Sequence, residues 1–298
     1  MSMTPVKIRN IYLGDGTPKI CIPLTATSRA ELSAQASAVL KVPCDMVEWR
    51  ADYYKPEETG ETESDGKSRR YTGAGKAVGE DTEKDRAKRD DSAERKAAAW
   101  IEDGLELLRG ILGDLPILFT FRTREEGGER SVPIETYRAW NLRAAESGNA
   151  DLVDLELNRG SALQRELTEQ IHRHGVRVIA SFHDFAKTPD KESLLRTIAA
   201  MQVLGADITK IAVMPQTERD VLTLLDATLA LREGAADRPY ITMSMSARGG
   251  MTRLCGSLTG SAVTFATAGC ASAPGQMDAE FVRRVIETLS YSKEQVAR

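Results

Sequence analysis

Cysteine is scarce in this chain, and its pattern is not that of a disulfide framework or a zinc site. The four cysteines lie far apart and form no CxxC pair; they are Cys21, Cys44, Cys255 and Cys270. Such usage is typical of free thiols in a reducing compartment. Apolar runs are also short: no stretch reaches the roughly 18 residues of a membrane helix, and residues 1–10 contain no apolar signal core. We therefore expect a soluble, cytoplasmic protein with no membrane partner.

An excess of either charge is lacking as well. The 298 residues contain 40 Lys and Arg against 44 Asp and Glu, a formal net charge of −4. This near balance argues against a general role at nucleic acids or at membrane surfaces. The hydrophobic content of 41% is sufficient to bury a sizeable core. We expect a globular chain with no nucleic-acid partner.

Residues 57–96 contain almost no apolar side chains. Burial there cannot offset the entropy lost on ordering, so we expect a solvated, largely disordered insertion. The Gly-Ala-Gly-Lys cluster at 73–76 is similar to a phosphate-binding loop, but Arg70 stands where that loop needs glycine, and no strand precedes it. We expect one domain over residues 1–298, interrupted by this polar insertion at about 57–96.

Elsewhere, short apolar runs alternate with helical patterns. The eight expected strands are residues 19–25, 45–51, 116–122, 152–157, 176–182, 206–215, 240–245 and 262–267, and the expected helices are about 28–40, 97–112, 161–174, 191–204, 218–232 and 278–291. A further strand-like run, 6–13, precedes Gly14-Asp-Gly16, which indicates an N-terminal hairpin with 19–25. Eight β-α units indicate a (β/α)8 TIM barrel of the α/β class. The alternative is an open doubly wound sheet, although no glycine fingerprint follows its first strand.

One lysine stands in the middle of the nearly continuous apolar run 206–215. In a strand, Lys210 shares a face with Ile208 and Ala212, and a run without strict alternation is typical of a strand covered on both sides. Burial favours the neutral amine, which is a nucleophile for a carbonyl, so Lys210 is a candidate Schiff-base lysine. The alternative is an ammonium that reaches outward to solvent or pairs with a carboxylate.

Polar side chains collect at the ends of the expected strands and in the loops after them. They are Glu48, Arg50, Arg122, Glu126, Asp154, Glu156, His183, Lys210, Arg253 and Gln276. Active sites of such barrels lie at this C-terminal face. Buried ions are costly unless paired, so a purely structural interpretation has to explain all of them at once. Single members remain open, because Glu48 with Arg50, or the two acids of strand 152–157, can be supporting ion pairs only.

The histidines differ in context. His172 and His174 lie near the end of an expected helix, where we expect them to be solvated. His183 instead follows an apolar strand at the expected catalytic edge. No further His, Cys or carboxylate cluster has the spacing of metal ligands, so we expect no metal.

These residues together support a mechanism. Lys210 forms an iminium with a ketone, which acidifies the adjacent C–H, and His183 removes that proton and returns it to a leaving hydroxyl. Glu126 holds the imidazole in the working tautomer, and Arg253 binds a substrate carboxylate through its guanidinium fork. Donors and acceptors for a polyhydroxylated ring come from Glu48, Arg50, Arg122 and Gln276.

Several motifs resemble those of type I 3-dehydroquinate dehydratase. They are Val47-Glu-Trp-Arg-Ala-Asp52, Phe119-Thr-Phe-Arg-Thr-Arg-Glu-Glu-Gly-Gly128, Asp151-Leu-Val-Asp-Leu-Glu156, Ser181-Phe-His-Asp184, Ala206-Asp-Ile-Thr-Lys-Ile-Ala-Val-Met-Pro215, Met243-Ser-Met245 with Thr252-Arg253, and Ala271-Ser-Ala-Pro-Gly-Gln276. The resemblance covers nearly the whole chain except the polar insertion. It implies a (β/α)8 barrel, usually a homodimer, that converts 3-dehydroquinate to 3-dehydroshikimate in the shikimate pathway of aromatic amino acid biosynthesis, without a cofactor.

The resemblance also implies a role for each matched residue. Lys210 matches the Schiff-base lysine, His183 the general acid/base and Glu126 the carboxylate that orients the histidine. The matched substrate-binding residues are Glu48, Arg50, Arg122, Arg253, Ser272 and Gln276. The loop 272–276 resembles the family's lid, and its Pro-Gly turn is compatible with closure over substrate.

Two other functions remain as alternatives. A Schiff-base aldolase on the same barrel would need a phosphate site, and the loop after the eighth strand is not a glycine-rich helix start. A non-catalytic sensor of quinate-like ligands would fit the loss of the lysine or the histidine, but Lys210 and His183 are both present.

Overall fold

The structure, a computed structural model, describes residues 3–55, 98–269 and 275–295. Its main sheet contains the parallel strands β3 (Lys19–Leu24), β4 (Met46–Arg50), β5 (Ile117–Thr120), β6 (Leu152–Glu156), β7 (Arg177–Asp184), β8 (Ile208–Val213), β9 (Tyr240–Ser244) and β10 (Val263–Thr267), with the short β11 (Met277–Asp278) beside β10. The strand order is β11-β10-β3-β4-β5-β6-β7-β8-β9. The sheet curls until β9 and β10 meet, where the Ala262 N–H donates to the Tyr240 carbonyl at 2.8 Å. The α/β barrel predicted from the sequence is confirmed.

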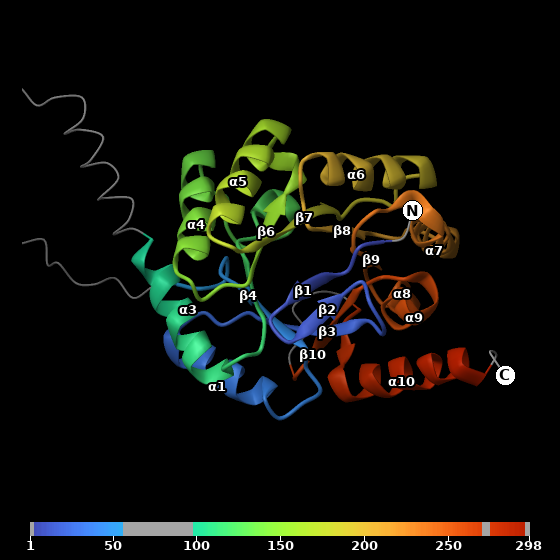
Figure 1. The fold of residues 1–298 in the computed structure, drawn as a ribbon, viewed down its shortest axis with the longest axis horizontal. Helices are drawn as coiled ribbons and strands as arrows, with labels where there is room; N and C mark the ends of the chain where they lie inside the picture. The colour runs from blue at the N-terminus through green and yellow to red at the C-terminus, as the bar shows by residue number, and fades with distance from the viewer. Residues whose placement is uncertain (1–2, 56–97, 270–274, 296–298) are drawn as a thin grey trace, which may run out of the picture.

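Helices surround this sheet (Figure 1). They are α1 (Arg29–Val39), α3 (Ala99–Leu112), α4 (Ile134–Glu146), α5 (Ser161–Arg173), α6 (Lys191–Val203), α7 (Glu218–Ala230), α8 (Gly250–Leu254), α9 (Gly256–Thr259) and α10 (Ala279–Gln295), with the 3-10 turns η1 (Arg124–Glu126) and η2 (Leu157–Arg159) and the π turn η3 (Leu231–Ala235). Ser28, Asp190 and Thr217 cap α1, α6 and α7, because each side chain accepts a hydrogen bond from an N–H of the first turn. None of the helices in the described ranges is both long and apolar enough to cross a membrane.

Strand β8 shows how the sequence sets the two faces of the barrel wall. All of its residues are buried, and Ile208 and Ala212 belong to the cluster inside the barrel. Ile211 and Val213 belong to the cluster beneath the outer helices. Lys210, between Ile208 and Ala212, therefore points into the barrel, as its position in the strand predicts.

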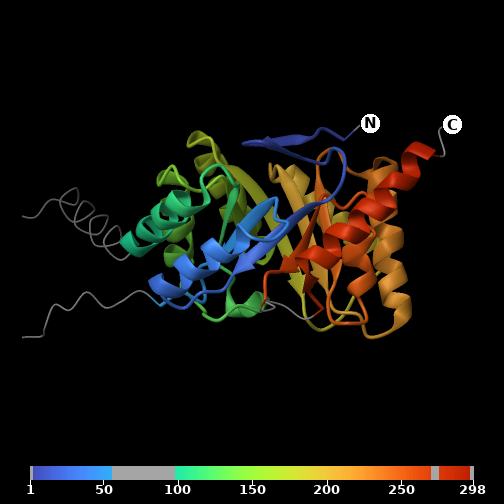
Figure 2. The same cartoon turned by 90° about the horizontal axis from the view of Figure 1, so that it is seen from below.

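The N-terminal hairpin is present but is built differently from the prediction. It consists of β1 (Val6–Ile8) and β2 (Ile11–Leu13), which pair antiparallel across a turn where Arg9 has a φ of 48°. Strand β3 pairs instead with β4 and β10. The predicted pairing of 6–13 with 19–25 is wrong, because the run 6–13 folds back on itself before Gly14. Figure 2 shows the hairpin across one end of the barrel, where Ile8 and Leu13 join the interior cluster.

Helices α4, α8 and α9 were not predicted. Helix α4 buries Asn141 beside Tyr137 and two alanines, so its inward face carries no stripe of large aliphatic side chains, and α8 and α9 are too short for a periodic pattern. The polar insertion predicted at 57–96 lies outside the described residues.

The outer core is aromatic on the side of α3 and α4. Six aromatic rings form a chain of edge-to-face and stacked contacts there, with ring centroids 4.7 to 5.9 Å apart. They belong to Trp49, Tyr54, Trp100, Phe119, Phe121 and Trp140. Helix α3 approaches β4 closely at Gly104, where an added Cβ would lie 2.3 Å from Cη2 of Trp49. This contact holds the outer layer against the strand that carries Glu48 and Arg50.

Candidate active site

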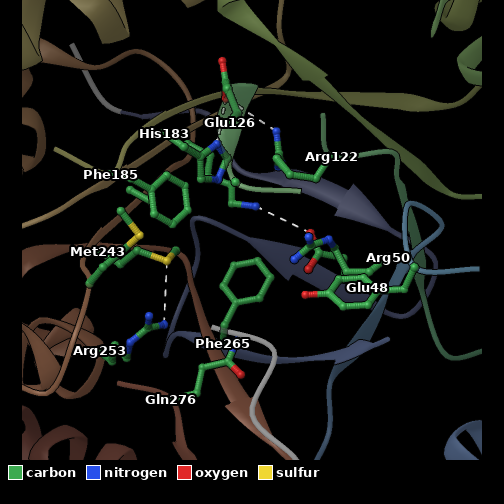
Figure 3. Close-up of a pocket in the computed structure, with 15 residues that line it drawn as sticks. Glu48, Arg50, Arg122, Glu126, His183, Phe185, Met243, Arg253, Phe265 and Gln276 are labelled. Carbon is green, nitrogen blue, oxygen red and sulfur yellow. Dashed lines mark hydrogen bonds and ion pairs between the residues drawn. The ribbon is translucent and has the colours of Figure 1, made fainter. Parts of the chain in front are cut away.

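A cavity of about 270 Å³ lies at the C-terminal ends of the barrel strands (Figure 3). It is lined by every predicted site residue that the structure describes: Glu48, Arg50, Arg122, Glu126, His183, Lys210, Arg253 and Gln276. The ninth predicted residue, Ser272, lies outside the described residues, as do the other residues of the expected lid before Gly275. Barrel geometry explains this convergence, because neighbouring parallel strands end at the same rim.

Lys210 is buried and ion-paired at the same time. Its Nζ lies 3.4 Å from Oδ2 of Asp154 and 3.5 Å from Oε1 of Glu48, and 4.7 Å from the centre of the Phe265 ring. The residue is 4% exposed, so the alternative of an ammonium extended into solvent is wrong. The pairing with carboxylates, which the sequence also left open, is present. Two carboxylates at this distance stabilise a cation on Nζ, whether an ammonium or an iminium.

His183 lies beside Lys210 on the next strand. Ser181 is in register with Lys210, and His183 is in register with Ala212, two residues further along both strands. Side chains two residues apart on a strand share a face, so these four residues point the same way, and the imidazole and the amine share the barrel interior. His183 Nδ1 is 2.9 Å from Oε2 of Glu126, in the arrangement predicted for the orienting carboxylate.

The protonation of this pair is set by burial. Burial lowers the pKa of His183 well below its usual 6.5, and the positive charges of Arg122 and Lys210 lower it further. Burial raises the pKa of Glu126 to about 8, although the guanidinium of Arg122 opposes the shift. Near neutral pH the imidazole is therefore uncharged, and Glu126 retains a proton that it loses as the pH passes about 8.

Arg122 is the centre of a buried ionic network. Its guanidinium lies 2.8 Å from Asp154 Oδ1, 3.1 Å from Glu156 Oε1 and 3.6 Å from Glu126 Oε2. Burial alone would lower the pKa of Arg122, but these carboxylates raise it above its ordinary value. Both acids of β6 pair with Arg122, and Asp154 also lies 3.4 Å from Nζ of Lys210, so its contacts go beyond a supporting ion pair.

Arg50 is held by a neighbour that was not predicted from the sequence. Asp52 accepts from Nε of Arg50 at 2.9 Å and from Nη2 at 2.8 Å, and the Tyr53 ring stacks on the guanidinium at 5.0 Å. Glu48 instead accepts from Thr120 Oγ1 at 2.9 Å and faces Lys210. The alternative that Glu48 and Arg50 serve only each other is therefore wrong.

Arg253 and Gln276 lie on the opposite side of the cavity from the His183–Glu126 pair (Figure 3). Arg253 belongs to α8, and its Nη1 is 3.7 Å from Sδ of Met243. Burial lowers the pKa of Arg253 to about 10, which still leaves it charged at neutral pH. A buried guanidinium that lines the same cavity as the amine of Lys210 is suited to hold an anionic group of a ligand.

The apolar part of the lining was not predicted. It consists of Phe185, Ala212, Met243, Met245 and Phe265, together with the ring of Tyr53. The signal was available, because Met243 and Met245 alternate inward on β9 and beyond it, and Phe185 follows His183 at the same spacing. Apolar residues at these positions do not stand out from a core pattern, so the sequence alone does not assign them to a site.

The two remaining histidines are remote from the cavity. His174 is exposed, as expected. His172 is less free than expected, since its Nε2 lies 2.6 Å from Oδ2 of Asp207.

Comparison with known proteins gives a consistent result. The family model described as type I 3-dehydroquinase matches residues 20–293. The 3-dehydroquinate dehydratase of Syntrophotalea carbinolica is 42% identical over 287 residues, which cover 96% of this chain and 98% of that protein. That of Klebsiella pneumoniae is 40% identical over 285 residues, covering 96% and 98%. The crystal structure of type I 3-dehydroquinate dehydratase from Clostridium difficile, with covalently modified comenic acid, aligns with a TM-score of 0.81 at 36% identity, covering 97% of this chain and 99% of that one.

Proposed function

The chain belongs to the type I 3-dehydroquinase family, and from this premise we propose that it dehydrates 3-dehydroquinate to 3-dehydroshikimate through a Schiff base on Lys210. Its relatives are 3-dehydroquinate dehydratases, which are hydro-lyases. The observation that carries the proposal is the position of Lys210: a buried amine between two carboxylates, beside an imidazole on the adjacent strand.

The first step joins the amine to the substrate ketone. The ammonium of Lys210 passes one proton to the imidazole of His183, and the neutral Nζ then adds to the carbonyl carbon. His183 returns that proton to the hydroxyl of the adduct, which leaves as water, so that a protonated imine remains. Glu48 and Asp154, which hold the ammonium at 3.5 and 3.4 Å, also neutralise this iminium. The charge at Nζ is therefore the same before and after the step, so the carboxylates need not rearrange.

The second step is the elimination. The iminium withdraws electrons from the neighbouring carbon, and His183 removes one of its protons to give an enamine. The enamine expels the hydroxyl from the next carbon of the ring. His183 donates its proton to this hydroxyl, which leaves as water. Hydrolysis of the remaining iminium releases the product and restores Lys210.

Glu126 sets the tautomer of His183. When Glu126 is ionised, it accepts the Nδ1–H and leaves the Nε2 lone pair available as a base. When Glu126 is protonated, it donates to Nδ1, and Nε2 then carries the hydrogen. Because the pKa of Glu126 is about 8, kcat/KM should rise with pH up to about that value.

The remaining polar groups are proposed to bind the substrate. Arg253 takes the carboxylate, and the ring hydroxyls contact Glu48, Arg50, Arg122 and Gln276. Ser272 is assigned to this set by the family motif alone. We further propose that the chain forms a homodimer, which sedimentation of the purified chain would test. We also propose that it acts in the cytoplasm, in the shikimate pathway.

Borohydride trapping tests the mechanism. Reduction during turnover should add the mass of the reduced ligand to the peptide that contains Lys210, while the dehydroshikimate enone absorbance grows without added metal or nucleotide. Lys210→Ala should show neither adduct nor turnover. His183→Ala should still form some adduct but turn over about 10²–10⁴-fold more slowly. An unmodified Lys210 peptide under turnover conditions would exclude the Schiff base.

A further inference from the structure

Glu156 lies fully buried at the end of β6, one side chain away from the cavity. It does not line the cavity, so it has no direct contact with a bound ligand to offer. We propose that Glu156 is a positioning residue for the dehydration: its carboxylate holds Thr123, and through Thr123 the turn that keeps Glu126 against His183. This inference rests on the proposed function and adds a residue to it.

The first link joins Glu156 to Thr123. Oε1 of Glu156 accepts from the Thr123 N–H at 2.8 Å, and Oε2 accepts from the Thr123 hydroxyl at 2.7 Å. Both oxygens of the carboxylate are thus engaged by one residue, in a fully buried setting where such bonds are strong.

The second link joins Thr123 to Glu126. Thr123 precedes η1, and its carbonyl accepts from the N–H of Glu126 at 3.0 Å and of Gly128 at 2.8 Å. These bonds close the turn on which Glu126 stands. At Gly128 an added Cβ would lie 2.0 Å from the Arg122 carbonyl oxygen, so the turn has little room to shift. The orientation of Thr123 therefore determines where the Glu126 carboxyl meets His183.

The third link is electrostatic. One nitrogen, Nη1 of Arg122, lies 3.1 Å from Glu156 and 3.6 Å from Glu126. Glu156 is the nearer partner of this guanidinium, and its own negative charge disfavours a second negative charge on Glu126, which raises the pKa of Glu126. The charged groups that face the Glu126–His183 pair are Arg50 on β4, Arg122 just after β5, Asp154 and Glu156 on β6, and Lys210 on β8. Loss of the charge on Glu156 shifts this balance toward ionised Glu126.

A purely structural role for Glu156 would make a different set of predictions. Arg122 is already paired with Asp154 at 2.8 Å, so it does not need a second buried acid for neutrality. If Glu156 only packed the end of β6, its replacement would change stability but not the protonation of the catalytic pair. The pH profile of turnover therefore separates the two roles.

Three variants of the whole chain provide the test. Glu156→Gln keeps the shape and an acceptor for the Thr123 N–H but removes the charge, and we expect the rise of kcat/KM to move to lower pH by about one pH unit. Thr123→Val keeps the charge but breaks the hydroxyl link, and we expect kcat to fall about tenfold with KM within about twofold. Tyr137→Phe is the control, because its hydroxyl accepts from the Glu156 N–H at 2.9 Å without touching the carboxylate. It should leave the pH profile in place.

The outcomes distinguish this inference from the proposed function. An acid shift in Glu156→Gln, absent in Tyr137→Phe, supports the positioning role. Equal profiles in wild type, Glu156→Gln and Tyr137→Phe overturn it, even if wild type dehydrates the substrate and is trapped by borohydride. If Glu156→Gln does not fold, Thr123→Val decides, and unchanged kcat there overturns the role. A wild-type chain that neither turns over nor is trapped refutes the proposed function itself.

Discussion

Replacing Glu126 with glutamine should change how stability depends on pH. Glu126 is 2% exposed, and burial raises its pKa to about 8 from its ordinary value of 4.5. Between these two pH values the folded protein binds the proton and the unfolded chain does not. Stability therefore falls as the pH rises through this window. Glutamine carries no titrating proton, so the variant should lack this decline.

The magnitude follows from the window. A group that is protonated in one state only changes the free energy of unfolding by about 1.4 kcal/mol per pH unit. The pKa of His183 is lowered, so its imidazole makes stability rise with pH. This effect is confined to pH values below about 6.5, where the imidazole of the unfolded chain binds a proton. From pH 6.5 to 8 the stability of wild type relative to Glu126→Gln should therefore fall by roughly 1.5 kcal/mol.

Urea unfolding at several pH values measures this difference. The matched control is Glu125→Gln on the same turn, because Glu125 is exposed and its pKa is lowered, mainly by a hydrogen bond to its own backbone. Glu125 is ionised in both the folded and the unfolded chain between pH 6.5 and 8. The free energy of unfolding of this variant should therefore differ from that of wild type by the same amount throughout this range. A constant difference for Glu126→Gln as well would refute the claim that Glu126 holds a proton in the folded state.

Further predictions concern packing, arginine orientation and metal independence. Gly104→Ala should destabilise the fold by about 1–3 kcal/mol in thermal unfolding, because the new Cβ would overlap the Trp49 ring; Gly110→Ala on the same helix, with open space around it, should not destabilise. Asp52→Asn removes one half of the fork that orients Arg50, and should raise KM about tenfold with a smaller change in kcat; equal KM values would contradict this role. Prolonged chelation should leave the turnover rate unchanged, because the proposed steps use only side chains, and recovery by added metal would count against them.

Much of the catalytic face could be predicted because it depends on short-range patterns. In a strand the side chains alternate, so the apolar run around Lys210 places the amine inside the barrel as soon as the run is assigned to a strand. The same rule places His183 on the neighbouring strand, and parallel strands end at a common rim. These predictions need only the local period and the order of the elements along the chain.

Which charged side chains of the cavity pair with one another was decided only by the tertiary structure. Arg50 pairs with Asp52 and not with Glu48, and Arg122 lies among three carboxylates, two from β6 and one from η1. Such pairings follow from the register between strands and from side-chain reach in three dimensions, neither of which a local pattern contains. The hairpin turn at Arg9, which has a positive φ, was misjudged, and helix α4, whose inward face lacks large aliphatic side chains, was missed, for a related reason. Their stability comes from packing against the rest of the barrel, and burial of that kind leaves no regular trace in the order of the residues.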